Sequence, residues 1–244
     1  HVVIAAKGYK KVKSAEIAKI SEDKKELGKI ENISCDCICV SGFWTPTIHL
    51  ASQSGNKTKF NEDIDAFVPD QSKQRETTLG SANGIFTLEE TLKTSFEAGH
   101  EISKKITNND NKISVPQVSE KKYTQHDKFW CVPLPKEKKY KRFLDFQNDV
   151  AVTDVELALR EGYRSIEHVK RYTTLGMATD QGKTSNLNGL QLVSNIENKI
   201  VPEVGHTTFR PPYTPVTIGA IVGREVGKHY RPTRKSPMHE WHEK

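Results

Sequence analysis

The segment GMATDQGKTSN, residues Gly176–Asn186, constrains the fold most because it separates two stretches with helical patterns. Its Gly-Lys-Thr triplet matches the second half of a nucleotide-binding P-loop, G-x-x-x-x-G-K-S/T. The spacing excludes a P-loop, because Met177 occupies the position of the first glycine. A P-loop also follows a β-strand, whereas a helical pattern precedes this segment. The segment is therefore either a phosphate-binding turn of another kind or a helix start without a ligand.

The composition predicts a soluble, globular chain of one large or two smaller domains, since its 244 residues are 35% hydrophobic and 28% charged. No apolar run approaches the roughly 18 residues that suggest a membrane span, and no signal-peptide pattern is present. The chain begins at His1 and enters a strand-like run directly, so we expect an internal piece of a longer polypeptide. We expect a cytoplasmic protein without a membrane partner.

The formal charge of +6 permits nucleic-acid binding. The excess of basic residues is local and falls in residues 136–142 and 224–235. No zinc-finger, RNA-recognition or helix-turn-helix motif accompanies these two clusters, so Lys-rich solvated loops explain them better. We therefore expect no nucleic-acid partner.

The cysteines resemble a metal cluster only at first sight. Cys35, Cys37 and Cys39 fall in the alternating run ISCDCICVSG, which predicts a strand with all three thiols on one face. At the rise of a strand the outer two Cα atoms are about 13 Å apart, too far for one tetrahedral zinc. We interpret the run as a buried strand and expect no metal site. Reduced thiols are typical of the cytoplasm.

The first half of the chain has β-rich and helical signals. Residues 1–40 predict a β-hairpin followed by a buried strand, and residues 50–77 predict an irregular stretch. Thr87 and Glu90 form a capping-box pattern at the start of a helix. The GSANG turn before it, Gly80–Gly84, allows a ligand to approach the backbone closely, or it is a tight turn that packs the helix on a strand.

The second half predicts helices. Residues 107–126 are polar and predict an interdomain linker, followed by a domain at residues 127–223 and a basic tail at residues 224–244. The helix signals in this domain are Thr153 as N-cap with Glu156, a second helix over Ser165–Gly176, a third over Asn186–Glu197, and a fourth over Pro215–Gly223 with Thr214 as cap.

The pattern from FLDFQNDV to GMATDQG resembles the small helical domain of bacterioferritin-associated ferredoxin, which binds a 2Fe–2S cluster through four cysteines. In this chain the four positions are Asp145, Gln147, Asp180 and Ser185, so the resemblance implies the fold without its cluster, because such clusters need thiolate or imidazole ligands. The polar turn that remains offers a positive charge and hydroxyls at a helix start, which favours phosphate. Alternatively, Ser185 or Asn186 caps the helix and Lys183 is solvated.

The proline-rich segment TTFRPPYTP presents Arg210 and Tyr213 on a rigid backbone. An arginine suits bidentate binding of phosphate or carboxylate, although a structural ion pair explains Arg210 equally well. His239 and His242 alone are too few ligands to indicate a metal site.

The motifs FLDFQNDV, VKRYTTLGMATDQGKTSN and TTFRPPYTPVTIGA, with CDCICVSGFWTPTIHLASQSG and GSANGIFTLEETL, resemble the α subunit of the heterotetrameric sarcosine oxidase family over nearly the whole chain. The resemblance implies a fold of α/β plus α+β class. Residues 1–106 would be the C-terminal portion of a pyridine-nucleotide oxidoreductase-like, NAD-binding domain, and the helical domain without its cluster would follow. The N-terminal part and a C-terminal folate-binding domain would be missing.

The resemblance also implies a function. In the family, sarcosine is oxidised at FAD in the β subunit, electrons pass to FMN at the α–β interface, and oxygen is reduced to hydrogen peroxide. Tetrahydrofolate accepts the one-carbon unit as methylenetetrahydrofolate. No catalytic residue is then expected on this chain, and its partners would be β, γ and δ subunits. The alternatives are a subunit of a related flavin-dependent amine, proline or opine dehydrogenase, and a scaffold that joins subunits.

Two groups of cofactor-binding residues follow from the resemblance. The NAD contacts of the family fall on Ala82, Asn83, Gly84, Phe86 and Leu88. Our hypothesis for the phosphate or the interface of FMN assigns Lys183, Thr184, Ser185 and Arg210.

Overall fold

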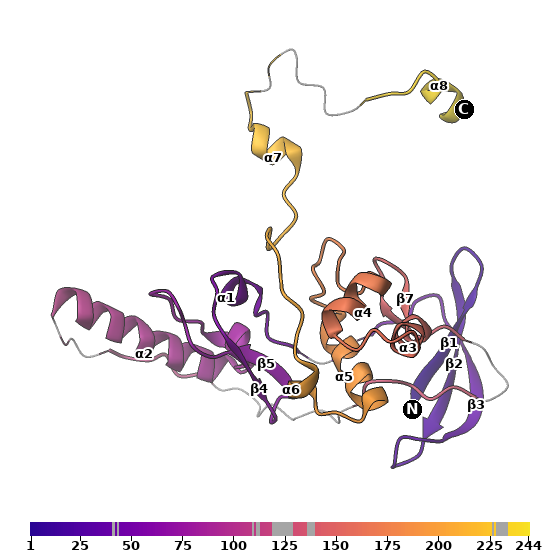
Figure 1. Cartoon of the computed structure of the whole chain (residues 1–244), viewed down its shortest axis with the longest axis horizontal. Coiled ribbons are helices and arrows are strands. Elements are labelled where there is room, and N and C mark those ends of the chain that lie inside the picture. The colour runs from indigo at the N-terminus through magenta and orange to yellow at the C-terminus, as the bar shows by residue number, and fades with distance from the viewer. Residues whose placement is uncertain are drawn as a thin grey trace.

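A computed structural model of the chain describes residues 1–40, 42, 44–108, 110, 113–118, 129–135, 140–225, 227 and 234–244. The N-terminal strands β1 (Val2–Gly8), β2 (Val12–Ile20) and β3 (Leu27–Ser34) form an antiparallel three-stranded sheet in that order (Figure 1). The predicted hairpin is therefore confirmed. Gly8 is required at its turn, because a Cβ there would lie 1.9 Å from the carbonyl oxygen of Lys11.

The predicted buried strand over the three cysteines is wrong. The sheet ends at β3, and the last backbone bond of this edge runs from the amide of Cys35 to the carbonyl of Lys13 at 3.1 Å. Cys37 and Cys39 follow in irregular backbone and are exposed, with their sulfur atoms 4.0 Å apart. An alternating run forms a strand only where a neighbouring strand pairs with it, and no described strand does so here.

The middle of the chain is more ordered than its polar sequence predicts. The short helix α1 (His49–Gln53) precedes a hairpin of β4 (Thr58–Asn61) and β5 (Ala66–Pro69). Phe60 and Phe67 are opposite each other across this hairpin, with ring centroids 5.3 Å apart. The prediction of an irregular stretch is therefore wrong over the hairpin, whose side chains pack against the helical core described below.

The predicted N-cap at Thr87 is confirmed, although the Glu90 carboxylate bonds to the Thr87 hydroxyl and not to its backbone amide as in a capping box. After the 3-10 turn η1 (Gly80–Asn83), α2 (Leu88–Thr107) begins with Thr87 accepting from the amide of Glu90 at 3.3 Å and donating to its carboxylate at 3.0 Å. The helix extends away from the body of the molecule and buries none of its residues (Figure 1).

The second half forms a compact helical unit. Strands β6 (Phe143–Asp145) and β7 (Val150–Ala151) lead into α3 (Val152–Arg160), α4 (Ile166–Thr173), α5 (Asn186–Glu197) and α6 (Val201–Val204). Its core includes Leu144, Val150, Val152, Val155, Ala158, Leu159, Ile166, Val169, Leu175, Leu190, Leu192, Val193 and Val201. Helix α5 is the central element, because most of its first nine residues are buried.

The third predicted helix is confirmed, whereas the boundaries of its neighbours need correction. Helix α3 begins one residue before Thr153, and the amide of Ala151 donates to the carboxylate of Asp154 at 2.8 Å, so the predicted pair of Thr153 and Glu156 is wrong. A carboxylate at the third helical position satisfies the free amide as well as an N-cap hydroxyl does. Helix α4 ends at Thr173, before a left-handed Thr174.

The C-terminal arm leaves the body beyond the proline-rich segment (Figure 1). Helix α7 (Ile218–Val222) begins at Thr217, whose hydroxyl accepts from the amide of Ala220 at 3.2 Å, so the predicted cap at Thr214 is wrong. Helix α8 (His239–His242) follows. Most of the predicted linker at residues 107–126 and parts of both basic clusters lie outside the described residues.

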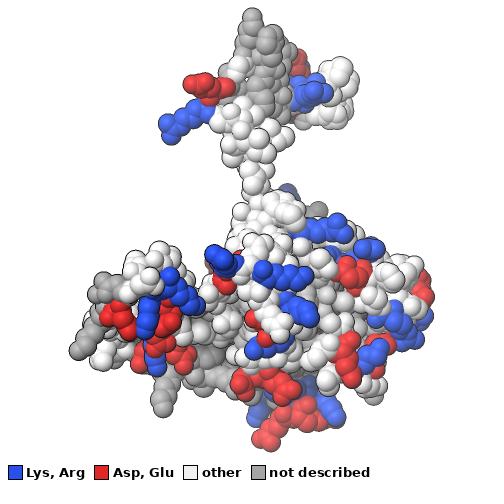
Figure 2. All heavy atoms as spheres, turned by 60° about the vertical axis from the view of Figure 1, so that its left-hand side comes forward, with Lys and Arg blue, Asp and Glu red and all other residues white. Residues whose placement is uncertain are grey.

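The described surface carries charges of both signs. Figure 2 shows Lys and Arg interspersed with Asp and Glu over the body of the molecule. No helix among the described residues is long and apolar enough to cross a membrane.

Candidate functional site

A buried carboxylate holds together the loop before α5. Asp145, at the end of β6, is 2% exposed. Its Oδ1 accepts from the amides of Gln147 and Asn148 at 2.9 and 3.3 Å, and its Oδ2 accepts from the amide of Gly176 at 2.9 Å. The hydroxyl of Ser185, 0% exposed, lies 3.5 Å from the same Oδ2. One side chain thus joins β6 to both ends of the loop between α4 and α5.

The four positions that would hold a cluster are brought together by the fold. Asp145 meets Ser185 across the loop, and Gln147 accepts from the hydroxyl of Thr179 at 2.8 Å and from the amide of Asp180 at 3.3 Å. Hydrogen bonds therefore link Asp145 to Ser185 and Gln147 to Asp180. Among the described residues no group of three or more His, Cys, Asp or Glu side chains could hold a metal ion.

The turn before α5 already contains an anion of its own. The carboxylate of Asp180 accepts from the amide of Gly182 at 3.0 Å, and from the amide and hydroxyl of Thr184 at 3.4 and 2.9 Å. The amides of Gly182 and Thr184 are therefore among the helix-start groups that we expected to bind a phosphate, and here they bind Asp180. Thr184 is exposed, whereas Ser185 points inward. The alternative reading, that Ser185 caps the helix, has no side-chain hydrogen bond to support it.

Lys183 connects this turn to the proline-rich segment. Its ammonium donates to the carbonyl of Tyr213 at 2.7 Å and to that of Asp180 at 3.2 Å, and it lies 4.4 Å from the centre of the Tyr213 ring. An ammonium has three donors, so one donor remains for a ligand. Arg210 is exposed on the same segment, and no described acidic side chain forms an ion pair with it.

A buried lysine that the sequence did not indicate lies under this segment. Lys170, on α4, is 9% exposed, and its ammonium donates to the carbonyl of Thr208 at 3.0 Å. Burial lowers the pKa of Lys170, Glu167 opposes this effect, and the charges of Arg210 and Arg171 add to it. The charges of Arg171, Arg210 and Glu167 thus all act on the buried ammonium of Lys170.

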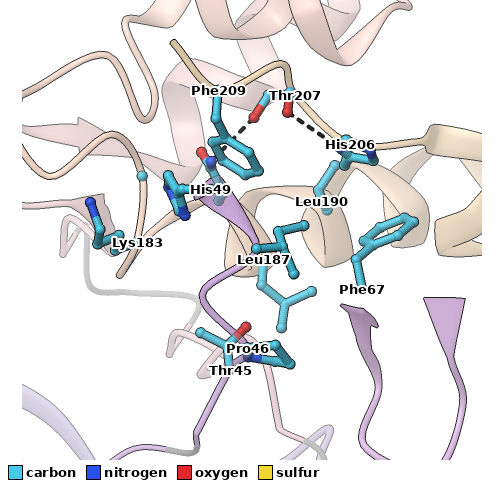
Figure 3. Close-up of a pocket in the computed structure, with 13 residues that line it drawn as sticks. Thr45, Pro46, His49, Phe67, Lys183, Leu187, Leu190, His206, Thr207 and Phe209 are labelled. Carbon is cyan, nitrogen blue, oxygen red and sulfur yellow. Dashed lines mark hydrogen bonds between the residues drawn. The ribbon is translucent and has the colours of Figure 1, made fainter. Parts of the chain in front are cut away.

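A small apolar pocket lies between α1, α5 and the proline-rich segment (Figure 3). Its volume is about 40 Å³. His49 is 3% exposed, and its Nε2 lies 2.9 Å from the carbonyl oxygen of Gln181. Its ring packs against that of Phe209 with centroids 3.8 Å apart and the planes tilted by 32°. The lining residues are Thr45, Pro46, Ile48, His49, Phe67, Gly182, Lys183, Asn186, Leu187, Leu190, His206, Thr207 and Phe209.

Burial lowers the pKa of His49, an effect that the Gln181 carbonyl opposes and the charge of Lys183 reinforces. The sequence carries no clear sign of this contact, because Gln181 lies 132 residues further along the chain. The signal that could have found it is a single histidine in the otherwise apolar start of a helix, HLAS, beside Ile48.

The predicted NAD residues surround η1. Gly84 has φ +80°, and a Cβ there would lie 2.6 Å from Ile64 and 3.1 Å from Val68, so packing of this turn on the β4–β5 hairpin requires glycine. Asn83 lines a polar cleft of about 460 Å³. Its other lining residues are Asn56, Lys59, Asn61, Val68, Pro69, Asp70, Ser72, Glu76, Thr77 and Thr78. Ala82 and Phe86 are half-buried and Leu88 is exposed, and none of the three lines the cleft.

The fold of the chain is similar to part of one solved dehydrogenase structure. The crystal structure of L-proline dehydrogenase from P. horikoshii is similar with a TM-score of 0.61, covering 91% of this chain and 44% of that chain at 20% sequence identity. The mixed helix and sheet content of the chain fits this class of fold.

Sequence comparison finds more specific similarities. Residues 139–224 match the family model of the sarcosine oxidase A3 domain. The sarcosine oxidase subunit alpha of Rhizobium meliloti is 37% identical over 243 residues, and that of Corynebacterium sp. strain P-1 is 35% identical over 234 residues, covering 100% and 93% of this chain. The chain is thus similar to sarcosine oxidase α subunits over 93–100% of its own length. It spans 24% of the length of these curated relatives.

Proposed function

We propose that the chain serves as part of a sarcosine oxidase α subunit. The complete enzyme would oxidatively demethylate sarcosine to glycine with oxygen and tetrahydrofolate, giving hydrogen peroxide and methylenetetrahydrofolate. The observation that carries the proposal is the 37% identity over 100% of this chain to a subunit of that name. The partners would be the β, γ and δ subunits, the FAD and folate sites would lie elsewhere in the complex, and the location would be cytoplasmic.

The role of this piece is to hold cofactors rather than to oxidise the amine. We propose that Lys183 and Arg210 supply the charge that receives the FMN phosphate or borders the flavin at the subunit interface. The third donor of Lys183, beyond its two bonds to carbonyls, and the exposed guanidinium of Arg210, which has no ion-pair partner among the described residues, support this role. Thr184 contributes an exposed hydroxyl beside them. Ser185, being buried, would act from inside by holding the loop to Asp145.

The NAD-site elements would be Ala82, Asn83, Gly84, Phe86 and Leu88. The polar cleft beside Asn83 supports this proposal, because its amides, hydroxyls and carboxylates match the hydrogen-bonding groups of a ribose and an amide. The NAD site would be completed by portions of the α subunit that this chain lacks.

We also propose that the helical unit has the bacterioferritin-associated-ferredoxin-like fold without its cluster. The support is the convergence of Asp145, Gln147, Asp180 and Ser185, with hydrogen bonds in the place of metal–thiolate bonds. A carboxylate with four donors can join the same loops that a cluster would join.

The test is co-expression of the chain, within its complete subunit, with the partner subunits. We expect a complex that contains FAD and FMN and produces hydrogen peroxide from sarcosine and oxygen. The fold likeness to L-proline dehydrogenase favours one alternative, a flavin-dependent dehydrogenase subunit. In that case sarcosine or another amine would reduce an artificial electron acceptor without forming peroxide. A complex without flavin at this subunit would favour the scaffold.

A further inference from the structure

The pocket beside His49 contains a buried hydrogen-bond acceptor without a partner. Nε2 of His49 faces the carbonyl of Gln181 at 2.9 Å, and a carbonyl only accepts, so Nε2 carries the proton. Burial lowers the pKa of the ring and so favours its neutral form, and protonation would also bring a second positive charge toward Lys183. Nδ1 therefore has a free lone pair, and it has no partner within the described residues.

Asn186 brings a second unpartnered acceptor to the same pocket. The side chain is 9% exposed, and its Nδ2 donates to the hydroxyl of Thr207 at 3.1 Å. The other atom of this amide, Oδ1, is buried and lacks a donor in the described part of the chain. Asn186 and His49 both line the pocket.

The backbone around this amide makes room for it. A Cβ at Gly176 would lie 2.1 Å from Oδ1 of Asn186, and one at Gly182 would lie 2.2 Å from its Cγ. Both glycines have positive φ, +67° and +72°. The loop is therefore shaped around a polar side chain, although a leucine of similar size would fill the space without leaving an unpaired oxygen.

We propose that this pocket binds a small, uncharged molecule that donates an O–H or N–H hydrogen bond to Nδ1 of His49 or to Oδ1 of Asn186. The pocket volume of about 40 Å³ exceeds the roughly 10–15 Å³ that one water needs. Water is thus the smallest occupant, and a primary amide such as formamide has the same donor chemistry. The proposal does not depend on the sarcosine oxidase function.

The charges around the pocket exclude ionic occupants. Lys183 lines the pocket and disfavours a cation, whereas an anion would face two lone pairs. The carboxylate of Asp180, whose charge acts on His49, is already bound by Gly182 and Thr184. The apolar walls, which include Leu187, limit the occupant to a small molecule.

Crystallography of the complete α subunit in its complex tests the proposal, with one crystal soaked in formamide and another in N,N-dimethylformamide, which has no N–H. We expect density within hydrogen-bond distance, about 3.2 Å, of one of the two acceptors: water in the native crystal and water or formamide after the first soak. An empty pocket in the native crystal, or N,N-dimethylformamide bound at the same occupancy as formamide, would overturn the proposal.

A variant supplies the control. His49→Phe keeps a ring stacked on Phe209 and removes the Nδ1 acceptor, so we expect the density to be lost or to shift to Asn186. Unchanged density next to the phenylalanine would contradict the role of His49. If the variant does not assemble, the ¹⁵N spectrum of histidine in the native protein decides, since a neutral His49 with a hydrogen-bonded Nδ1 is expected and a protonated ring would reject the proposal.

Discussion

Replacing Asp145 with asparagine tests the claim that its carboxylate holds the α4–α5 loop in place. The amide oxygen can keep the two bonds from Gln147 and Asn148, but the amide NH₂ then faces the amide of Gly176, donor against donor. A charge-assisted hydrogen bond contributes about 1.5–3 kcal/mol, and a buried donor left unpaired costs about 1–3 kcal/mol. Removal of a buried charge offsets part of this loss, so we expect a destabilisation of about 3 kcal/mol.

The assay is urea unfolding followed by circular dichroism, with thermal unfolding as a second measurement. For a chain of this length the expected loss lowers the melting temperature by about 6–12 °C. Asp149→Asn is the matched control, because Asp149 is exposed four residues further on and has φ +54°, which asparagine adopts readily. A loss below about 0.5 kcal/mol for Asp145→Asn, equal to that of the control, would refute the reasoning.

The remaining predictions concern the turn, the pocket and the long helix. Gly182→Ala should lower the free energy of unfolding, measured in urea, by more than about 2 kcal/mol, because its Cβ would overlap Asn186. The control Gly162→Ala has φ +95° and nothing within 4 Å of the added Cβ, so it should cost only about 1 kcal/mol. Equal losses would contradict the packing argument. His49 has a folded pKa below its ordinary value of 6.5, so the unfolded chain binds the proton first and stability should fall as the pH drops below 6.5. His49→Phe should reduce this slope, and an unchanged slope would contradict the lowered pKa of His49. Thr87→Ala should remove about 1 kcal/mol from α2 and lower the helical signal in circular dichroism, since the helix has no buried residue to hold it; an unchanged signal would contradict the capping role.

Local signals in the sequence predicted those elements whose ends depend on neighbouring residues. Thr87 and Glu90 lie three residues apart and form their bonds within one turn, so the start of α2 could be read directly. The apolar run of α5 likewise predicted its bounds, Asn186–Glu197. At α3 the signal was ambiguous, because Asp154 and Thr153 are both good capping residues and only the fold selects between them.

Features that depend on distant partners could not be predicted. The cysteine run has the alternation of a strand, but pairing needs a neighbour, and none of the described strands lies beside it. Lys183 looked free for a ligand, yet the carbonyl of Tyr213, 30 residues away in the chain, accepts one of its donors. The burial of His49 and Asn186 against one pocket depends equally on contacts between the two halves of the chain.

The FMN content of the complete complex tests the central claim most directly. Lys183→Ala, Lys183→Gln and Arg210→Ala should each lower the ratio of FMN to FAD, with the glutamine variant showing whether charge or hydrogen bonding matters. Lys199→Ala is the control, since Lys199 is exposed on the same helical unit and pairs with Glu197. The account predicts a lower FMN-to-FAD ratio in the three variants and an unchanged ratio in the control. Full FMN occupancy in all three, in complexes that assemble normally, would contradict the assignment of this turn to the flavin.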